Sequence, residues 1–312
     1  MMQNAASTSF QNRKFIEKRN RPNFFNRRNI LPWLILLPGI LLFTFYIWYP
    51  MLNGIYLSFF ETKGFKPIEF IGLENYMNLF KDKLFYKALT NSFTYVFWSL
   101  LSGFAVPVVL AIVVNEVVHF KGLIRVGLYF PNMVPLIAAL MLWKFMMAPG
   151  KGGFFNSLIA LAGLPSFGWL QESSWTIPLI VLMATWRGAG GTALIYVASL
   201  QGVSPDLYEA ASLDGAGVWQ KIRHITLPGI YNMSRLMLIL QVIFVFQILY
   251  EPLVTTSGGP VNASLSLMLL NYNFAFQDLR IGMASTVGVI VSCILVLLSF
   301  VYLKFSKENE MS

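Results

Sequence analysis

The chain has 312 residues, of which 56% are hydrophobic and only 12% are charged, and its formal net charge is +9. This composition is too apolar for a soluble globular domain of that length, so lipid must be the main solvent of the chain. The positive charge could indicate a nucleic-acid partner, but the cytoplasmic flanks of membrane helices explain it better. Cys293 is the only cysteine of the sequence, which excludes a disulfide within the chain.

Apolar segments of membrane-spanning length recur along the chain. A spanning helix needs about 20 apolar residues. We therefore predict an all-α membrane protein whose transmembrane domain covers residues 30–303. The six expected spans are 31–60, 88–115, 123–147, 176–200, 233–254 and 281–303. The fourth span is interrupted by Arg187, and the fifth carries Glu251 near its end.

Lysine and arginine residues set the predicted orientation of these spans. Seven of them, from Arg13 to Arg28, precede the first span, which predicts a basic cytoplasmic tail over residues 1–29. With six spans, the tail 304–312 and the loop 204–228 are also cytoplasmic. The five lysines between Lys63 and Lys87 fit the outer side less well, although acidic residues are mixed among them.

The loop 204–228 is a polar, glycine-punctuated segment between two apolar ones. Ser204 can cap a helix that begins at Pro205, and Gly215 can close it. A second short helix is expected from Val218 to Leu227, where Pro228 would stop it. By itself this pattern is also compatible with an ordinary capped amphipathic hairpin.

The same loop resembles the EAA loop of bacterial ABC importer permeases, through Glu209, Ala210, Ala211 and Gly215, with Ile225, Leu227 and Pro228 at the family's spacing. The resemblance implies that the loop is a coupling helix that docks into a cleft of the ATP-hydrolysing subunit. The residues to which it assigns this coupling are Glu209, Ala210, Ala211, Asp214, Gly215, Ile225, Leu227 and Pro228. In that role Glu209 would meet a basic residue of the ATPase, and the alanines would allow close docking.

Other segments extend the resemblance from about residue 30 to the end. Those that match are 70–76, 130–135, 143–153 and 256–260. They are similar to oligosaccharide and glycerophosphate importer permeases, the relatives of the maltose system's membrane subunits. The resemblance implies a six-helix bundle of the type I importer class, with both termini cytoplasmic, in a multi-pass protein of a bacterial cell membrane. The implied partners are a second homologous permease, an ABC ATPase dimer, an extracytoplasmic solute-binding protein and a carbohydrate substrate, with no nucleic acid.

The sequence lacks the groups that an enzyme of its own would need. The glycine-rich segment 149–153 has neither the spacing nor the hydroxyl of a phosphate-binding loop. His119 and His224 do not have the spacing of a zinc site. We therefore expect no cofactor or metal on this chain, and ATP with Mg²⁺ on the partner ATPase.

Polar and aromatic residues within the spans are candidates for the substrate pathway. Charged side chains in a bilayer cost about 2.5 to 3.5 kcal/mol, so Arg187 is expected to line the pathway or to pair with an acid such as Glu251. A sugar requires aromatic faces together with amides or hydroxyls. The candidates are Trp186, Arg187, Tyr196, Gln247, Tyr250, Glu251, Asn271 and Tyr272. Each aromatic could instead be a packing or membrane-belt residue, and Gln247 stands where some relatives carry an acid, which leaves the charge of the substrate open.

Two other functions compete with the permease interpretation. An ion-coupled secondary transporter acting without an ATPase would need membrane-embedded acids, and only Glu251 qualifies. A membrane-embedded enzyme of polysaccharide or lipid synthesis would need a cytoplasmic loop rich in aspartate or histidine, which the sequence does not contain.

Overall fold

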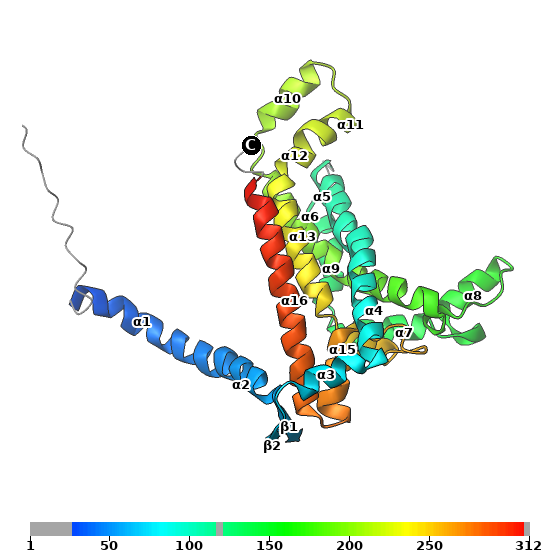
Figure 1. Ribbon diagram of the computed structural model, residues 1–312. Coiled ribbons are helices and arrows are strands. Elements are labelled where there is room, and N and C mark those ends of the chain that lie inside the picture. The colour runs from blue at the N-terminus through cyan, green and yellow to red at the C-terminus, as the bar shows by residue number, and fades with distance from the viewer. Residues whose placement is uncertain (1–26, 117–120, 309–312) are drawn as a thin grey trace, which may run out of the picture. The chain divides into compact units, whose positions relative to one another are not determined.

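The computed structural model of the chain describes residues 27–116 and 121–308 (Figure 1). It divides into two compact units, the first ending at Leu52 and the second beginning at Asn53. Most of the predicted tail 1–29 and the last four residues of the tail 304–312 lie outside the described residues. The limits of the predicted tails and of the transmembrane domain therefore stay predictions.

The first unit is a helix with an apolar surface. It consists of α1 (Arg27–Phe43), the π-helical turn η1 (Thr44–Trp48) and the start of α2 (Tyr49–Leu57). From residue 32 to residue 52 every side chain is exposed within the chain. The segment Pro32–Leu57 is long and apolar enough to cross a membrane, so its apolar surface is compatible with lipid.

The second unit begins with a hairpin and ends with a long helix. Its strands are β1 (Phe60–Lys63) and β2 (Lys66–Phe70), an antiparallel pair. Its helices before the polar loop are α3 (Glu74–Lys81), α4 (Lys83–Ser99), η2 (Leu100–Phe104), α5 (Ala105–Glu116), α6 (Lys121–Met133), α7 (Leu136–Met146), η3 (Gly150–Gly152), α8 (Phe154–Leu161), η4 (Trp169–Gln171) and α9 (Ser173–Leu200). Those that follow are α10 (Pro205–Leu213), α11 (Val218–Lys221), η5 (Ile222–Thr226), α12 (Leu227–Gly229), α13 (Tyr231–Phe246), α14 (Tyr250–Thr255), α15 (Leu267–Tyr272), η6 (Asn273–Gln277) and α16 (Ile281–Glu308).

The number of spans depends on how two bent helix pairs are counted. Among the described residues, four helices are long and apolar enough to cross a membrane, and the number rises to six if each bent pair is one span. The prolines within the expected span 123–147 predict a kinked or interrupted helix, and the structure has two helices there, α6 and α7, that meet at 90°. Pro135 caps α7 with extended backbone, and because proline has no N–H it cannot continue the hydrogen-bond ladder of α6.

The expected fifth span, 233–254, also differs from the structure. Helix α13 ends at Phe246, and α14 is a separate helix that begins at Tyr250. On its other side, α13 meets the segment Val218–Gly229 at 65°. The fifth apolar segment is therefore the single helix α13, which a break separates from α14 and a bend separates from the segment Val218–Gly229.

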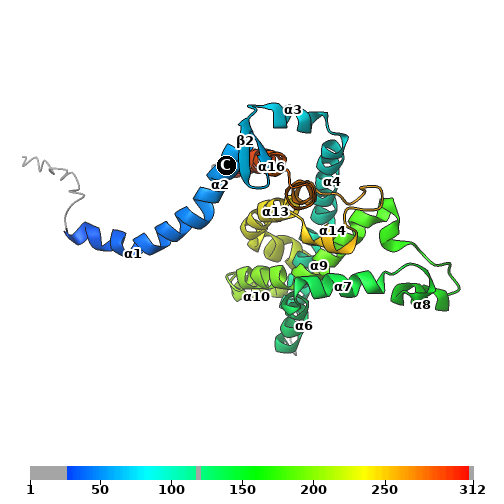
Figure 2. The same ribbon diagram turned by 90° about the horizontal axis from the view of Figure 1, so that it is seen from below.

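Helix α9 is the central helix of the second unit. It packs against α4, η2, α5, α6 and α13. Of these, α4, α6 and α13 are labelled on different sides of α9 in Figure 2. Gly190 makes the contact with α6 possible, since a Cβ at that position would lie only 1.8 Å from Leu128 O. Gly190 and Gly191 thus allow close packing of α9 against α6 while α9 stays helical, whereas a Cβ at Gly188 would meet open space.

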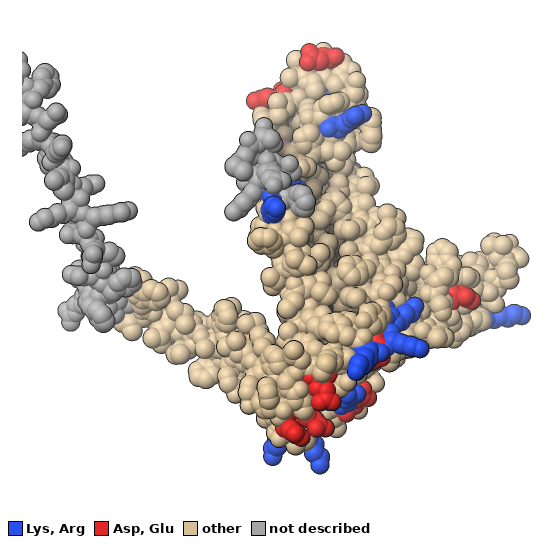
Figure 3. Space-filling model, viewed as in Figure 1, with Lys and Arg blue, Asp and Glu red and all other residues tan. Residues whose placement is uncertain are grey.

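The two ends of this bundle differ in what they carry. The hairpin α10–α12 lies at one end, and the β-hairpin, α3 and α15 lie at the other (Figure 1). Figure 3 shows charged side chains mainly toward these ends, with a bare stretch between them on the bundle face in view. A charge-free band between charged ends is the pattern of a membrane bundle.

Candidate coupling hairpin and central pocket

The outgoing arm of the 204–228 loop is the capped helix α10. Its first free N–H, from Asp206, donates to Ser204 Oγ at 3.3 Å, and Pro205 occupies the first helical position. Gly215 ends the helix with φ of +78°, and Ala216 N–H then donates back to Ala211 O at 2.8 Å. The cap, start and end of this helix are those predicted from the sequence.

The returning arm does not stop where the sequence predicts. Val218 begins a helix that passes through η5 and continues beyond Pro228 to Gly229. In η5 the N–H of Leu227 donates to Ile222 O, one residue farther back than in an α-helix. Pro228 is the second residue of α12, where a missing N–H interrupts little, and the helical run ends at Gly229, two residues beyond the predicted end at Leu227.

The predicted coupling residues are mostly exposed on this hairpin. Glu209, Ala210, Asp214, Gly215, Leu227 and Pro228 are exposed, and Ala211 and Ile225 are half-buried.

The structure adds apolar side chains that sequence reasoning did not single out. Leu213 is 89% exposed and Trp219 is 70% exposed, with Leu207 and Val218 beside them in the chain. Exposed apolar groups at the polar end of a membrane bundle mark a surface for a partner. Their signal in the sequence was their presence within an otherwise polar loop.

Side chains also join the two arms of the hairpin. The hydroxyls of Tyr208 and Thr226 lie 3.1 Å apart, and Lys221 Nζ donates to Ser212 Oγ at 2.7 Å. The hairpin is therefore connected at its turn and also across its length.

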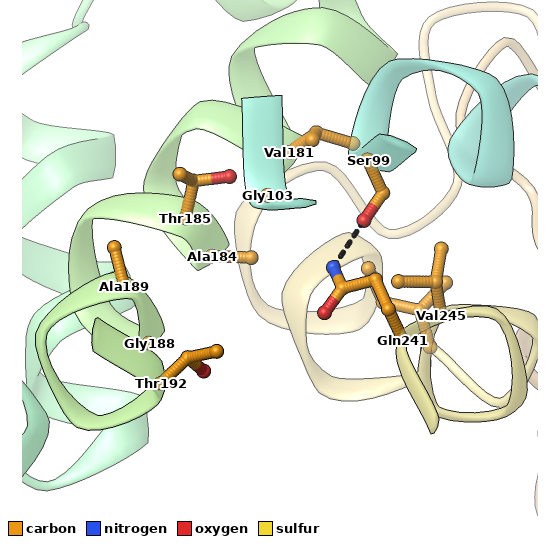
Figure 4. A pocket seen from close by; sticks show the side chains of 11 residues that line it. Ser99, Gly103, Val181, Ala184, Thr185, Gly188, Ala189, Thr192, Gln241 and Val245 are labelled. Atoms are coloured by element: carbon orange, nitrogen blue, oxygen red, sulfur yellow. Dashed lines mark hydrogen bonds between the residues drawn. The ribbon is translucent and has the colours of Figure 1, made fainter. Parts of the chain in front are cut away.

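A pocket lies between the helices that surround α9 (Figure 4). It is lined by Ser99, Gly103, Val181, Ala184, Thr185, Gly188, Ala189, Thr192, Gln241, Val245 and Ile248. The amide of Gln241 donates to Ser99 Oγ across it, from α13 to α4. Gly103 allows this approach, since a Cβ there would lie 2.6 Å from Gln241 Nε2.

The polar groups of the pocket are uncharged hydroxyls and one amide. Thr185 adds a hydroxyl 3.4 Å from Ser102 Oγ, and Thr192 adds another on the same face of α9. Such groups can donate and accept hydrogen bonds without a net charge. The sequence signal that was missed is a serine and a glycine four residues apart in a charge-free span.

None of the eight predicted pathway residues lines this pocket. Arg187 and Glu251 are both half-buried, and Arg187 Nε has no hydrogen-bond partner among the described residues. Trp186 packs edge-on against Trp143, with ring centroids 5.6 Å apart. Gln247 and Tyr250 are exposed.

Three more of the eight have clear packing partners. Tyr196 is fully buried in a cluster with Ala193 and Leu200. Asn271 Nδ2 donates to Ala284 O at 2.8 Å and so ties α15 to α16, and the ring of Tyr272 lies 5.0 Å from that of Phe276. A pathway role for the eight residues stays a prediction.

The comparison with protein families identifies the chain. Residues 103–308 match the family described as "Binding-protein-dependent transport system inner membrane component". The chain belongs to this family. It is a multi-pass inner-membrane permease subunit of a binding-protein-dependent ABC transporter, whose ATPase is a separate polypeptide. The alternative of a secondary transporter without an ATPase is therefore dropped.

Individual relatives match over nearly the whole chain. The probable ABC transporter permease protein YurN of Bacillus subtilis is 33% identical over 290 residues, covering 91% of this chain and 99% of the relative. The arabinooligosaccharides transport system permease protein AraP of Halalkalibacterium halodurans is 30% identical over 282 residues, covering 90% and 89%. A chain of the bacterial alginate ABC transporter, solved with an alginate pentasaccharide-bound periplasmic protein, superposes with a TM-score of 0.81 at 25% identity, covering 90% of this chain and 96% of that one.

Proposed function

We propose that this chain is one of two permease subunits of an importer for oligosaccharides, and that its 204–228 hairpin receives the motion of an ABC ATPase dimer. The observation that carries the proposal is the capped helix α10, exposed at the end of the bundle opposite the β-hairpin and flanked by exposed Leu213 and Trp219. A helix that exposes both an acid and apolar side chains outside the lipid is suited to a protein partner.

The substrate class follows from the relatives and from the pocket. AraP carries arabinooligosaccharides by its name, and the alginate transporter binds an oligosaccharide through its periplasmic protein. The uncharged hydroxyls and amide of the pocket are groups that pair with sugar hydroxyls. A saccharide delivered by an extracytoplasmic binding protein would meet these groups inside the bundle.

The position of the hairpin in the chain supports a mechanism of alternating access. Helix α9 leads into the hairpin and α13 leads out of it, and both helices line the pocket. A displacement of the hairpin therefore acts on two walls of the pocket at once. ATP and Mg²⁺ would bind on the partner ATPase, and its closure would bias the bundle between two packings that open to opposite sides.

Uptake by the complete importer tests the coupling assignment. Glu209→Lys reverses a charge on the exposed face of α10, and Gly215→Trp places a bulky side chain at a φ of +78°. We expect both variants to insert in the membrane normally and to lose uptake by at least tenfold. Normal uptake in both would disprove the coupling role.

A panel of labelled substrates tests the substrate class. Vesicles with the complete importer would be offered arabino-oligosaccharides, alginate oligosaccharides, a monosaccharide and an amino acid. We expect uptake of at least one oligosaccharide, and a several-fold rise in its KM in Gln241→Leu, which removes the amide from the pocket. Transport of the amino acid alone would contradict the proposal.

A further inference from the structure

We infer that the hydroxyl pair Tyr208–Thr226 is a positioning contact that holds the coupling helix α10 ready for its partner and joins it mechanically to α13. This inference rests on the proposed coupling role of the hairpin and adds the residues through which that role operates. Neither residue belongs to the predicted docking set. Both would act through α10, and neither would need to touch the ATPase.

The two arms of the hairpin are joined at three levels. At the base, Val203 approaches Gly229 so closely that a Cβ on the glycine would lie 2.6 Å from Val203 Cγ2. In the middle, the Tyr208 and Thr226 hydroxyls lie 3.1 Å apart. The residue numbers rise along the outgoing arm while those of their partners fall along the returning arm, as expected for an antiparallel helix pair.

The third level lies near the turn. Lys221 Nζ donates to Ser212 Oγ at 2.7 Å, and Ser212 Oγ in turn donates to Tyr208 O at 2.6 Å. The Ser212 hydroxyl thus connects Lys221 by two successive hydrogen bonds to the backbone of Tyr208. Because Ser212 is exposed, water competes with this contact, and it should hold the arms less firmly than the middle one.

The middle contact is the one that is protected from water. Thr226 is fully buried and Tyr208 is half-buried, whereas the rest of α10 is largely exposed. A buried hydroxyl that loses its partner costs more than an exposed one, because no water replaces the bond. The Tyr208–Thr226 pair should therefore dominate the attachment of α10 to the returning arm.

The position of Thr226 in the chain explains how the contact can transmit force from α10 to α13. Thr226 is the last residue of the π-helical turn η5, and only α12 separates it from α13. Helix α13 carries Gln241, which reaches across the pocket to Ser99. A force on α10 can thus pass through Tyr208 and Thr226 to α13, besides passing through the chain to α9.

Loss of the contact should leave α10 folded but loosely held. Its cap at Ser204 and its end at Gly215 are independent of Tyr208. A partner would then have to order the helix on binding, which weakens association without removing any contact at the interface.

The test uses the complete importer, with both permeases and the ATPase dimer, in lipid nanodiscs. Tyr208→Phe and Thr226→Val each remove one hydroxyl at nearly constant volume, and Thr226→Ser keeps the hydroxyl. Tyr302→Phe on α16 is the matched control, because the Tyr302 hydroxyl has no hydrogen bond to a described residue. Two quantities are measured: amide hydrogen exchange over residues 205–214, and the rate at which a labelled ATPase dimer dissociates.

We expect Tyr208→Phe and Thr226→Val to raise both rates about three- to tenfold, as the loss of one hydrogen bond predicts. The double variant should be no worse than either single one, because both remove the same bond. Thr226→Ser and Tyr302→Phe should behave as wild type.

Glu209→Lys separates this inference from the proposed function. If Glu209→Lys speeds dissociation while Tyr208→Phe and Thr226→Val change neither rate, the docking surface stands and the positioning role is overturned. If Glu209→Lys changes neither dissociation nor uptake, the coupling assignment fails, and the inference fails with it.

Discussion

The two ends of the bundle are built in opposite ways. At the end with the β-hairpin, Asn75 Nδ2 donates to Ser58 O and Phe60 O, both at 3.0 Å, and Asn75 is buried. There too the N–H of Gly282, at the start of α16, donates to Thr62 Oγ1 at 2.9 Å. At the other end, two hydrogen bonds between side chains join the arms of the hairpin α10–α12, which exposes Leu213 and Trp219.

Both ends expose apolar side chains, among them Phe65 and Ile68 of the β-hairpin, so the ends differ in how hydrogen bonds fasten them to the bundle. The bond from Asn75 to Ser58 O is buried, and the bonds Asn75–Phe60 O and Gly282–Thr62 are partly buried, so breaking one leaves a group with reduced access to water unpaired. The coupling hairpin leaves apolar surface exposed, so part of its stability must come from a partner. Changes at the first end should therefore affect the folding of this chain, and changes at the second should affect mainly its association.

Gly282→Val should have the largest effect of the changes considered, as a loss of stability at the β-hairpin end. A Cβ at Gly282 would lie 2.4 Å from Phe60 O, and a backbone atom cannot rotate away. We expect a loss of about 3 kcal/mol or more in stability, seen as a lower melting temperature in detergent and a poor yield.

Gly54→Val is the control for that change, because nothing lies within 4 Å of a Cβ on Gly54. Equal melting temperatures for Gly282→Val and wild type would show that the contact between α16 and β1 is not tight.

Asn75→Leu should have the next largest effect. It removes the two hydrogen bonds to Ser58 O and Phe60 O and leaves both carbonyls without that donor, at a cost of about 2 kcal/mol. Thermal unfolding of the purified chain measures the change. Asn78→Leu, at an exposed position of the same helix face, should unfold as wild type does. If the two variants melt together, the buried amide is not what fastens this end.

Gly215→Ala tests whether the coupling hairpin can be destabilised without affecting the stability of the rest of the chain. A side chain at a φ of +78° is strained by about 1 kcal/mol even though the space around it is open. We expect faster amide exchange in α10 and weaker ATPase association, with an unchanged melting temperature. Gly217→Ala, at an ordinary φ of −69°, should change none of these. A fall in melting temperature in Gly215→Ala would mean that the hairpin is part of the global folding unit.

Ser204→Ala should give the smallest effect. It removes the cap bond to Asp206 N–H, worth about 0.5 to 1 kcal/mol, and should raise exchange only in the first turn of α10. Ser204→Asp keeps an acceptor at the cap and should restore protection. Unchanged exchange in Ser204→Ala would show that the cap does not limit fraying of this helix.

Local signals explain what could be predicted of the fold. The start of α10 at Pro205, its end before Gly215 and the charge-free length of α16 all depend on residues within one or two helical turns. The prolines of residues 130–135 predicted a kink or an interruption of the third span, and only the structure decides that it is a break with a 90° bend between α6 and α7. The helical run that includes Pro228 follows the π-helical turn η5, and the sequence analysis did not predict that turn.

The sequence predicted the part of the candidate site that is one continuous segment. It did not predict the pocket, which is formed by residues from separate helices. Glu209 and Ala210 were found because they lie in one short pattern, and the structure leaves both exposed. Ser99 and Gln241 lie far apart in the sequence and meet only because α4 and α13 pack beside α9. Tyr196 is fully buried in a packing cluster, and the sequence could not tell such a position from one that faces a pathway.

The sequence by itself determined that lipid is the solvent of this chain, where most of the apolar helices run, and that a capped polar helix interrupts them at 204–228. These properties are set by hydrophobic length and by hydrogen-bonding groups close along the chain. Only the tertiary structure decided which polar groups face a common pocket, where Gly190 and Gly282 must be glycine, and that Tyr208 meets Thr226. Those contacts join helices that are distant in sequence, and the packing of whole elements fixes them.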